Sequence, residues 1–257
     1  MAGLDLKDDV RRFWDSAPCG TSDATTAARE PDYARLERQR AEREPFISDF
    51  ARFDETRGKR VLEVGVGAGT DHIRFARAGA RCVGIDLSDV SLLVTRNRFE
   101  REGFPIRLSH GDAEALPFAD GSFALVYSWG VIHHTPDTQA AAREILRVLK
   151  SGGRFCVMVY NRHSLLALQA WLVFAAARGS PFTSVADVIR THVESPGTRA
   201  FTAREAQQLF RTASQVSVET LVTPYDLRIG RRLFLPAWAR RLVPARFGWF
   251  HVVTGIK

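Results

Sequence analysis

The stretch VLEVGVGAGTDH, residues 61–72, decides how this chain folds. An apolar run leads directly into three glycines at alternate positions, Gly65, Gly67 and Gly69. A short apolar run that ends in glycines is typical of a buried strand that turns into a helix, and glycine lets the backbone approach a ligand closely. The stretch predicts a nucleotide-type site beyond a strand end, although an ordinary tight turn could also use two of these glycines.

The glycine spacing departs from the dinucleotide fingerprint G-x-G-x-x-G, because Thr70 stands where the third glycine belongs. Glu63 lies two residues before Gly65, inside the otherwise apolar run. A buried carboxylate needs a partner, and it would repel a pyrophosphate but attract a cationic ligand. These two features weigh against an NAD-dependent oxidoreductase.

Strand-like and helix-like segments alternate from residue 60 to residue 160, which predicts a parallel sheet covered on both faces. One predicted helix begins after Ser88 and ends at Gly103, and a later one begins at Thr202 with Glu205 at the capping-box position. Each of these residues is a characteristic helix-terminus signal.

Acidic residues follow the second and third predicted strands. Asp86 lies 21 residues after Gly65, where a carboxylate can accept hydrogen bonds from both hydroxyls of a ribose. Both NAD and S-adenosylmethionine carry such a ribose, so Asp86 does not separate them. Asp112 follows the third strand, where an acid could receive an adenine amino group.

The ordered segments VLEVGVGAGT, GIDLS, GDAEALPFADGSFALVYSWGVIHH and EILRVLKSGGRF resemble the class I S-adenosylmethionine-dependent methyltransferases. The resemblance covers roughly residues 58–160 and is strongest to the group that includes the ubiquinone and menaquinone methyltransferases. It implies an α/β fold with a doubly wound, mostly parallel seven-stranded sheet of Rossmann-like type, whose last strand is inserted antiparallel. It also implies S-adenosylmethionine as the cofactor.

The resemblance assigns cofactor-binding roles residue by residue. Glycines of the loop approach the amino acid part, with Glu63 near the ammonium; Asp86 holds the ribose. The full set of implied cofactor-binding residues is Glu63, Gly65, Gly67, Gly69, Asp86, Leu87, Asp112, Ala113, Ser128 and Trp129.

The expected domain organisation is an N-terminal helical segment or lid at 1–56 and a methyltransferase domain at 57–257. The latter carries a cap insertion at 161–200 and a basic segment at 224–247. The run LLALQAWLVFAAA inside the insertion is apolar nearly all round, which favours a buried helix over one facing an apolar acceptor or a membrane.

Methyl transfer from a sulfonium is an in-line displacement, so the protein mainly positions the reactants, and a base is needed only for a hydroxyl or activated-carbon acceptor. Candidate catalytic residues follow strands four and five, and candidate acceptor contacts come from the N-terminal segment and the insertion. Capping of the next helix is the alternative for the histidine pair. The catalytic candidates are His133, His134 and Tyr160, and the acceptor candidates are Trp14, Tyr33 and His163.

Net charge is +7, and residues 223–257 hold seven basic side chains against one acidic. This segment leaves open a peripheral contact with an anionic membrane or an ordinary solvated face. We expect a small-molecule acceptor, methylated on O, N or C, and no nucleic acid partner, since no recognised RNA-binding motif is present. An RNA or protein methyltransferase and a non-catalytic cofactor-binding scaffold are the alternatives.

The three cysteines form no CxxC pair or zinc spacing, so we expect no metal and a reduced, cytoplasmic protein. The first residues lack the apolar region of a signal peptide, and the longest apolar stretch, 165–177, is too short to span a bilayer.

Overall fold

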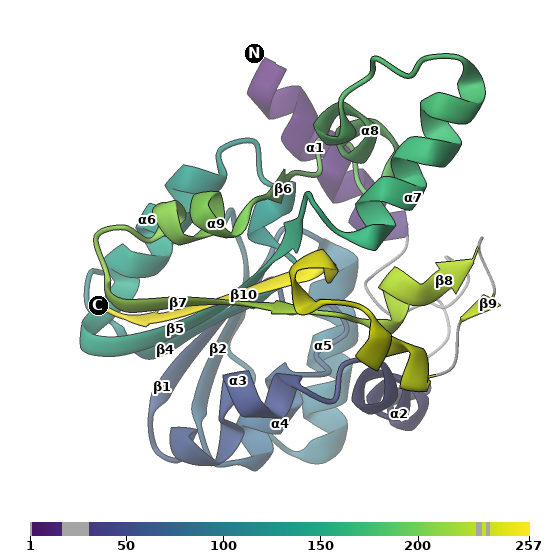
Figure 1. The fold of residues 1–257 in the computed structure, drawn as a ribbon. Helices are drawn as coiled ribbons and strands as arrows, with labels where there is room; N and C mark the ends of the chain where they lie inside the picture. The colour runs from purple at the N-terminus through teal and green to yellow at the C-terminus, as the bar shows by residue number, and fades with distance from the viewer. Residues whose placement is uncertain (1, 17–30, 230–232, 235–236) are drawn as a thin grey trace.

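A central mixed sheet organises the computed structural model, which describes residues 2–16, 31–229, 233–234 and 237–257 (Figure 1). The strand order is β3-β2-β1-β4-β5-β10-β7, with β1 to β5 parallel and β10 antiparallel to both of its neighbours. The strands are β1 (Arg60–Val64), β2 (Arg81–Asp86), β3 (Leu108–His110), β4 (Phe123–Trp129), β5 (Leu149–Asn161), β7 (Ser214–Leu221) and β10 (Phe250–Ile256). This confirms the predicted seven-stranded fold with an antiparallel inserted strand.

Three short strands complete the sheet inventory of the described residues. β6 (Ala200–Phe201) pairs with the end of β5 and makes the central sheet eight-stranded. β8 (Arg228–Ile229) and β9 (Leu233–Phe234) form a separate two-stranded sheet. The basic segment predicted at 224–247 is therefore a series of short elements, and residues 230–232 and 235–236 of it lie outside the described part.

Alternation along β1 explains how the sheet is covered on both faces. Leu62 and Val64 pack into a core that includes helices α6 (Thr138–Val148) and α9 (Ala203–Leu209). Val61 packs into the opposite core, with α3 (Ile47–Ala51), α4 (His72–Arg77) and α5 (Asp89–Glu102). Figure 1 shows these two helical layers on either side of the strands. Glu63 has the same parity as Val61, so its side chain points towards α4.

The predicted helix termini are present. The Ser88 hydroxyl accepts a hydrogen bond from the Ser91 backbone at 3.1 Å, and Gly103 ends α5 with a φ of 71°. Thr202 and Glu205 form the reciprocal capping box at the start of α9. Each cap satisfies backbone donors that would otherwise be left without partners.

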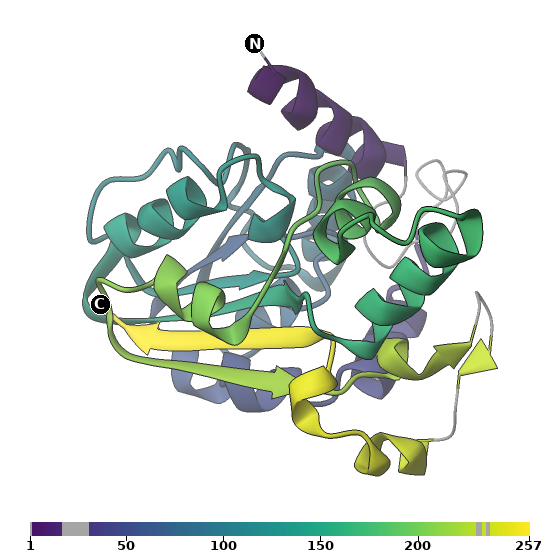
Figure 2. The same cartoon turned by 45° about the horizontal axis from the view of Figure 1, so that its top comes forward.

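The additions to the sheet are α1 (Ala2–Ser16), α2 (Tyr33–Arg43), α7 (Leu165–Phe174), α8 (Val185–His192) and the 3-10 turns η2 (Phe53–Thr56), η3 (Ile132–His134), η4 (Ala176–Arg178), η5 (Pro224–Leu227), η6 (Ala237–Leu242) and η7 (Ala245–Phe247). Figures 1 and 2 show α1 beside α8 at one end of the sheet. A Cβ on Gly197, which follows α8, would lie 2.9 Å from Leu6 of α1. The N-terminal helix and the insertion therefore pack together.

The expected burial of α7 is wrong. Only its small residues, Ala167 and Ala170, are buried, whereas Leu168 and Val173 are 48% and 56% exposed. The helix packs on α8 through its alanine side, with Leu166, Trp171 and Phe174 partly buried beside it, and it leaves one stripe, Leu168, Leu172 and Val173, facing outward.

No helix among the described residues has the length and apolar character needed to cross a membrane. Cys82 and Cys156 are free thiols in the core, and Cys19 lies outside the described residues.

Candidate active site

A cavity of about 250 Å³ lies at the carboxyl ends of the parallel strands. The glycine loop after β1 forms one wall, and residues of α1 and α2 form others. Among the residues predicted from the sequence, those on its wall are Trp14, Glu63, Gly65, Gly67, Asp86, Leu87, Asp112, Ala113, Trp129 and His134. The structure thus gathers side chains separated by more than 100 residues around one space.

Only glycine fits at position 65, because of its backbone conformation and its close neighbours. Its φ is +81°, and a Cβ built on it would lie 2.2 Å from Cγ2 of Val131. Gly69 also has a positive φ, but the Cβ there would meet Thr95 on α5, and Gly69 is not on the cavity wall. The first glycine therefore shapes the cavity and the third packs the loop against a helix.

Glu63 is 3% exposed, and its carboxylate oxygen lies 3.0 Å from Nδ1 of His72 on α4. Burial lowers the pKa of His72 to about 3, so this partner is a neutral imidazole, which shares a hydrogen bond with Glu63 but does not compensate its charge. Burial, together with the nearby carboxylates Asp71 and Asp86, raises the pKa of Glu63 well above its usual value. A cationic group in the cavity would favour the ionised form of Glu63.

Asp86 joins the second strand to the glycine loop. One carboxylate oxygen accepts a hydrogen bond from the Gly67 amide at 2.9 Å, and the other accepts one from the Ser88 amide at 2.9 Å. Burial raises the pKa of Asp86 despite these hydrogen bonds. The carboxylate is therefore held at the cavity wall by two fixed backbone donors.

Helix α1 closes over the ends of three strands through polar contacts. Lys7 lies 2.6 Å from Asp112 and 2.5 Å from Glu114, both after β3. Asp15 accepts a hydrogen bond from the Ser88 hydroxyl at 2.7 Å, after β2. The Trp14 ring meets the His134 ring edge-on at 5.2 Å, after β4. None of these contacts except a general role for Trp14 was predicted from the sequence.

A buried charge network, which the sequence analysis missed, forms the far side of the cavity. Arg40 on α2 bridges Asp71 at 2.5 Å and Glu44 at 3.0 Å. Tyr127 donates to Asp71 at 2.9 Å, and the Trp129 indole donates to Glu44 at 2.7 Å. Charged residues in a helical N-terminal segment gave no signal that they would face inward.

The cavity is acidic: five carboxylates line it, against three basic side chains. The carboxylates are Glu44, Glu63, Asp71, Asp86 and Asp112, and the basic side chains are Lys7, Arg40 and Arg43. This balance fits a ligand that carries positive charge and disfavours a pyrophosphate.

The histidine pair lies on η3, directly after β4. His133 is fully buried, its ring nitrogens make no hydrogen bond of standard geometry within the described part of the chain, and its ring packs 3.9 Å from the Tyr160 ring. Burial and the neighbouring His134 lower the pKa of His133 well below its usual value, while the Met158 backbone slightly opposes this. Helix α6 is capped by Asp137 instead, so the alternative that the pair caps the next helix is wrong.

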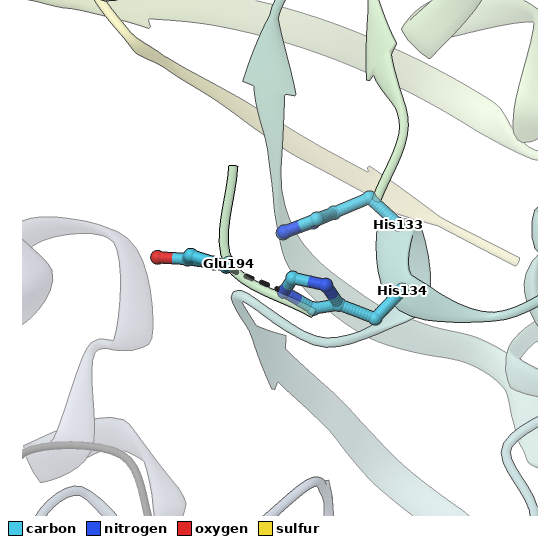
Figure 3. Close-up of side chains that lie close together, drawn as sticks. All are labelled: His133, His134 and Glu194. Carbon is cyan, nitrogen blue, oxygen red and sulfur yellow. Dashed lines mark ion pairs between the residues drawn. The ribbon is translucent and has the colours of Figure 1, made fainter. Parts of the chain in front are cut away.

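His134 faces the cavity and contacts the loop after α8. Its Nδ1 lies 2.8 Å from the Ser195 hydroxyl and 3.0 Å from the Thr198 hydroxyl, and its Nε2 lies 3.3 Å from a carboxylate oxygen of Glu194 (Figure 3). His133, His134 and Glu194 also offer ligand atoms that all lie within 4.8 Å of one another, so they could hold a metal ion.

Several predicted site residues lie off the cavity wall. Tyr33 donates to the backbone oxygen of Val94 at 2.8 Å, and His163 is exposed beyond β5. The Ser128 hydroxyl donates to the Val64 backbone beneath the loop, and Tyr160 lies behind His133. Tyr33 and His163 therefore do not line this cavity, and an acceptor contact by either residue stays a prediction.

The doubly wound sheet with antiparallel β10, and the acidic cavity beyond its parallel strands, define a class I methyltransferase fold. Residues 62–157 match the methyltransferase domain family. The domain and its fold imply S-adenosylmethionine as the cofactor, and the acidic cavity with its glycine loop fits that group.

Curated relatives support this assignment. Over 111 residues the chain is 38% identical to methyltransferase GfsG of Streptomyces halstedii, covering 42% of this chain and 40% of the relative. It is 37% identical over 107 residues to demethylmenaquinone methyltransferase of Tropheryma whipplei, covering 41% and 44%. It is 31% identical over 185 residues to sterol 24-C-methyltransferase erg6 of Aspergillus fumigatus, covering 58% and 48%. The matched part of the chain thus spans less than half the length of these relatives.

Solved structures share the fold across most of the chain. The PH0226 protein of Pyrococcus horikoshii superposes with a TM-score of 0.58 at 17% identity, covering 89% of this chain and 95% of that one. The [4+2]-cyclase SpnF superposes with a TM-score of 0.55 at 20% identity, covering 100% and 94%. At these identities the likeness is one of fold alone.

Proposed function

We propose that the full chain transfers a methyl group from S-adenosylmethionine to an O, N or C atom of a small-molecule acceptor. The observation that carries the proposal is a single cavity in which the glycine loop and three strand-end carboxylates, Glu63, Asp86 and Asp112, meet an aromatic wall. A sulfonium cofactor with an ammonium group and a ribose matches those carboxylates in charge and hydrogen bonding.

Each carboxylate takes the role that its position allows. Glu63 lies beside the amino acid end, where an ammonium would favour its ionised form. Asp86 would accept hydrogen bonds from the ribose hydroxyls, and Asp112 would accept one from the adenine amino group. Leu87 and Ala113 line the same cavity and would flank the adenine with their apolar side chains.

When bound, the cofactor supplies an electrophilic methyl group and a neutral leaving group, so the chain's own residues mainly orient the reactants. Residues 1–56 act as a lid and residues 161–200 as a cap in this proposal. Contacts of Lys7 and Asp15 hold α1 across the strand ends, where the helix excludes water from the cavity.

The walls indicate what the acceptor is like. Val10, Trp14, Leu36, Trp129 and Tyr225 line the same cavity as the carboxylates. These are apolar or aromatic surfaces, which favour a largely apolar small molecule.

We further propose a peripheral membrane contact for the exposed apolar side chains. Leu172 on α7 and Trp238 and Leu242 on η6 are 48%, 64% and 73% exposed, and Arg241 is exposed on the same turn. Flotation with vesicles that contain anionic lipid should depend on that lipid and weaken with salt. Equal flotation with neutral vesicles would exclude the electrostatic part of this contact.

A turnover screen tests the proposed activity. The chain is incubated with S-adenosylmethionine and a panel of phenols, amines, quinones and lipid-like acceptors, and S-adenosylhomocysteine is measured. We expect acceptor-dependent product from the wild-type chain and at least tenfold less from Asp86→Ala. Cofactor binding without turnover on any acceptor would favour a non-catalytic scaffold, and turnover only with RNA or protein would redirect the substrate class.

A further inference from the structure

Two histidines and a carboxylate from distant parts of the chain lie together beside the cavity. His133 and His134 are on η3, and Glu194 is in the loop after α8 (Figure 3). One ring nitrogen of each histidine and one carboxylate oxygen of Glu194 all lie within 4.8 Å of one another. The packing of the insertion against the end of β4 therefore creates a cluster of three possible metal ligands.

Both histidines are buried with ring nitrogens that the protein does not satisfy. Neither ring nitrogen of His133, nor Nε2 of His134, makes a hydrogen bond of standard geometry with any residue that the structure describes. Buried polar atoms in this condition are rare, because losing water without gaining a partner is unfavourable. A bound cation that accepts a lone pair from each ring would satisfy both histidines.

The surroundings of His134 direct a lone pair from Nε2 towards the carboxylate. The Thr198 hydroxyl donates to the Ser195 carbonyl at 2.6 Å, so the Thr198 oxygen accepts from Nδ1 of His134 at 3.0 Å. Nδ1 therefore carries the hydrogen of the neutral ring, and Nε2 presents its lone pair 3.3 Å from Oε2 of Glu194. Metal-binding histidines are oriented in the same way, with the second ring nitrogen donating to an oxygen.

The loop holds Glu194 firmly in this position. The φ of Glu194 is +56°, in the left-handed region that non-glycine residues rarely adopt, and the Tyr160 hydroxyl donates to its Oε2 at 2.7 Å. The Arg199 amide donates to the His133 carbonyl at 2.9 Å and ties the loop to η3. A backbone conformation that the surroundings enforce in this way is characteristic of functional sites.

The distances and the ligand types suit a zinc ion. In a tetrahedral site with bonds of about 2.1 Å, neighbouring ligand atoms lie about 3.4 Å apart, close to the 3.3 Å between Nε2 of His134 and Oε2 of Glu194. Two imidazoles and one carboxylate are a known ligand set of zinc, and they leave a fourth position for water. The Glu194 side chain is 39% exposed, so an ion and a water molecule can reach the site from solvent.

We propose that His133, His134 and Glu194 bind one Zn²⁺ ion, which ties the insertion to the end of β4. The ion lies between the histidines and the loop after α8, on the side of His134 that faces Glu194. It would therefore fix the His134 part of the cavity wall without contacting the acceptor. This inference does not depend on the proposed methyl transfer. It revises the expectation of no metal, which considered only the spacing of the cysteines.

Calorimetry with ZnCl₂ on the chelator-treated full chain tests the site. We expect one Zn²⁺ per chain with a Kd of about 1 µM or below, and no binding of Mg²⁺, which prefers oxygen ligands. Glu194→Gln keeps the size of the side chain and removes its charge, and His134→Ala removes a ring nitrogen; each should weaken Zn²⁺ binding at least about tenfold. The matched controls Glu100→Gln and His163→Ala change exposed residues and should bind Zn²⁺ like wild type.

Amide hydrogen exchange measures whether the ion holds the insertion. Zn²⁺ should slow exchange at residues 193–199 in the wild-type chain and in both controls, because the ion links this loop to η3. The same Zn²⁺ concentration should leave exchange in Glu194→Gln unchanged. Equal slowing in Glu194→Gln and in wild type would contradict the assignment of this carboxylate as a ligand.

The binding measurements decide the inference. A wild-type chain that does not bind Zn²⁺, an affinity that Glu194→Gln leaves unchanged, or an equal loss in the two exposed controls would overturn it. Far-UV circular dichroism checks that each variant is folded. If His134→Ala is not folded, Glu194→Gln decides alone, since it changes a partly exposed side chain and adds no cavity.

Discussion

Replacing Gly65 with alanine tests the packing of the glycine loop. The new Cβ would lie 2.2 Å from Cγ2 and 2.8 Å from Cγ1 of Val131, and the residue has a φ of +81°. The left-handed conformation costs about 1–2 kcal/mol, and forcing a methyl group into packed surroundings costs about 1–3 kcal/mol more. We expect Gly65→Ala to lower the free energy of unfolding by about 2–5 kcal/mol.

Gly103→Ala is the matched control, because Gly103 has a similar φ of +71° but no atom within 4 Å of the added Cβ. Gly103→Ala should lower the free energy of unfolding by about 1–2 kcal/mol, the cost of the left-handed conformation alone. Urea unfolding at constant pH measures both. The double variant Gly65→Ala, Val131→Ala should recover part of the loss, with a coupling of about 0.5–3 kcal/mol. Equal destabilisation by the two glycine variants, or strict additivity with Val131→Ala, would refute the steric reasoning.

Three further predictions concern the N-terminal segment and the buried charges. The double variant Lys7→Ala, Asp15→Ala should speed the dissociation of S-adenosylmethionine, measured by stopped flow, because it removes the contacts that hold α1 over the cavity. It should change the free energy of unfolding by only about 1 kcal/mol, because a partly exposed ion pair and hydrogen bond contribute little. An unchanged dissociation rate would argue against a covering role for α1. Arg40→Ala should lower the free energy of unfolding by about 3–5 kcal/mol, since it removes the hydrogen-bonded cation of the buried Asp71 and leaves only Arg74, at 3.7 Å, as its ion-pair partner. Thermal unfolding at neutral pH would show a smaller loss if water replaces the arginine. Burial lowers the pKa of His251 from an ordinary 6.5 to about 4 in the folded chain. Between these two pH values the unfolded chain binds a proton at His251 that the folded chain does not, so stability is lost as the pH falls from about 6.5 to 4. In His251→Gln the free energy of unfolding should fall by about 3 kcal/mol less than in wild type between pH 6.5 and pH 4. An unchanged dependence of the unfolding free energy on pH would contradict the lowered pKa of His251.

The sequence predicted the parts of the fold that depend on local pattern. The β1 strand, the glycine loop, the Ser88 cap and the Gly103 terminus all follow from neighbours within a few residues, and all are present. The number of strands and the antiparallel β10 came through the family resemblance, because pairing between distant strands leaves no local signal.

Contacts across the site could not be predicted in the same way. The sequence required a partner for Glu63 but gave no means of naming His72, and it gave no sign that Arg40 would turn inward to Asp71. Glu194 lies 60 residues beyond His134, in a loop whose proline and glycine indicated only a turn. Such pairs depend on where whole elements pack, which composition and periodicity do not encode.

Exposure of the insertion was also misjudged for a physical reason. An apolar helix was expected to bury all of its faces, yet α7 packs through Ala167 and Ala170 and leaves Leu168 outside. Hydropathy reports how apolar a helix is, but the size of the side chains decides which face allows close packing.

Calorimetry with S-adenosylmethionine and with NAD tests the central claim most directly. The acidic cavity, the buried Glu63 and the displaced third glycine together predict that the wild-type chain binds S-adenosylmethionine and does not bind NAD. Binding of NAD alone would contradict the assignment of this cavity to a cationic methyl donor.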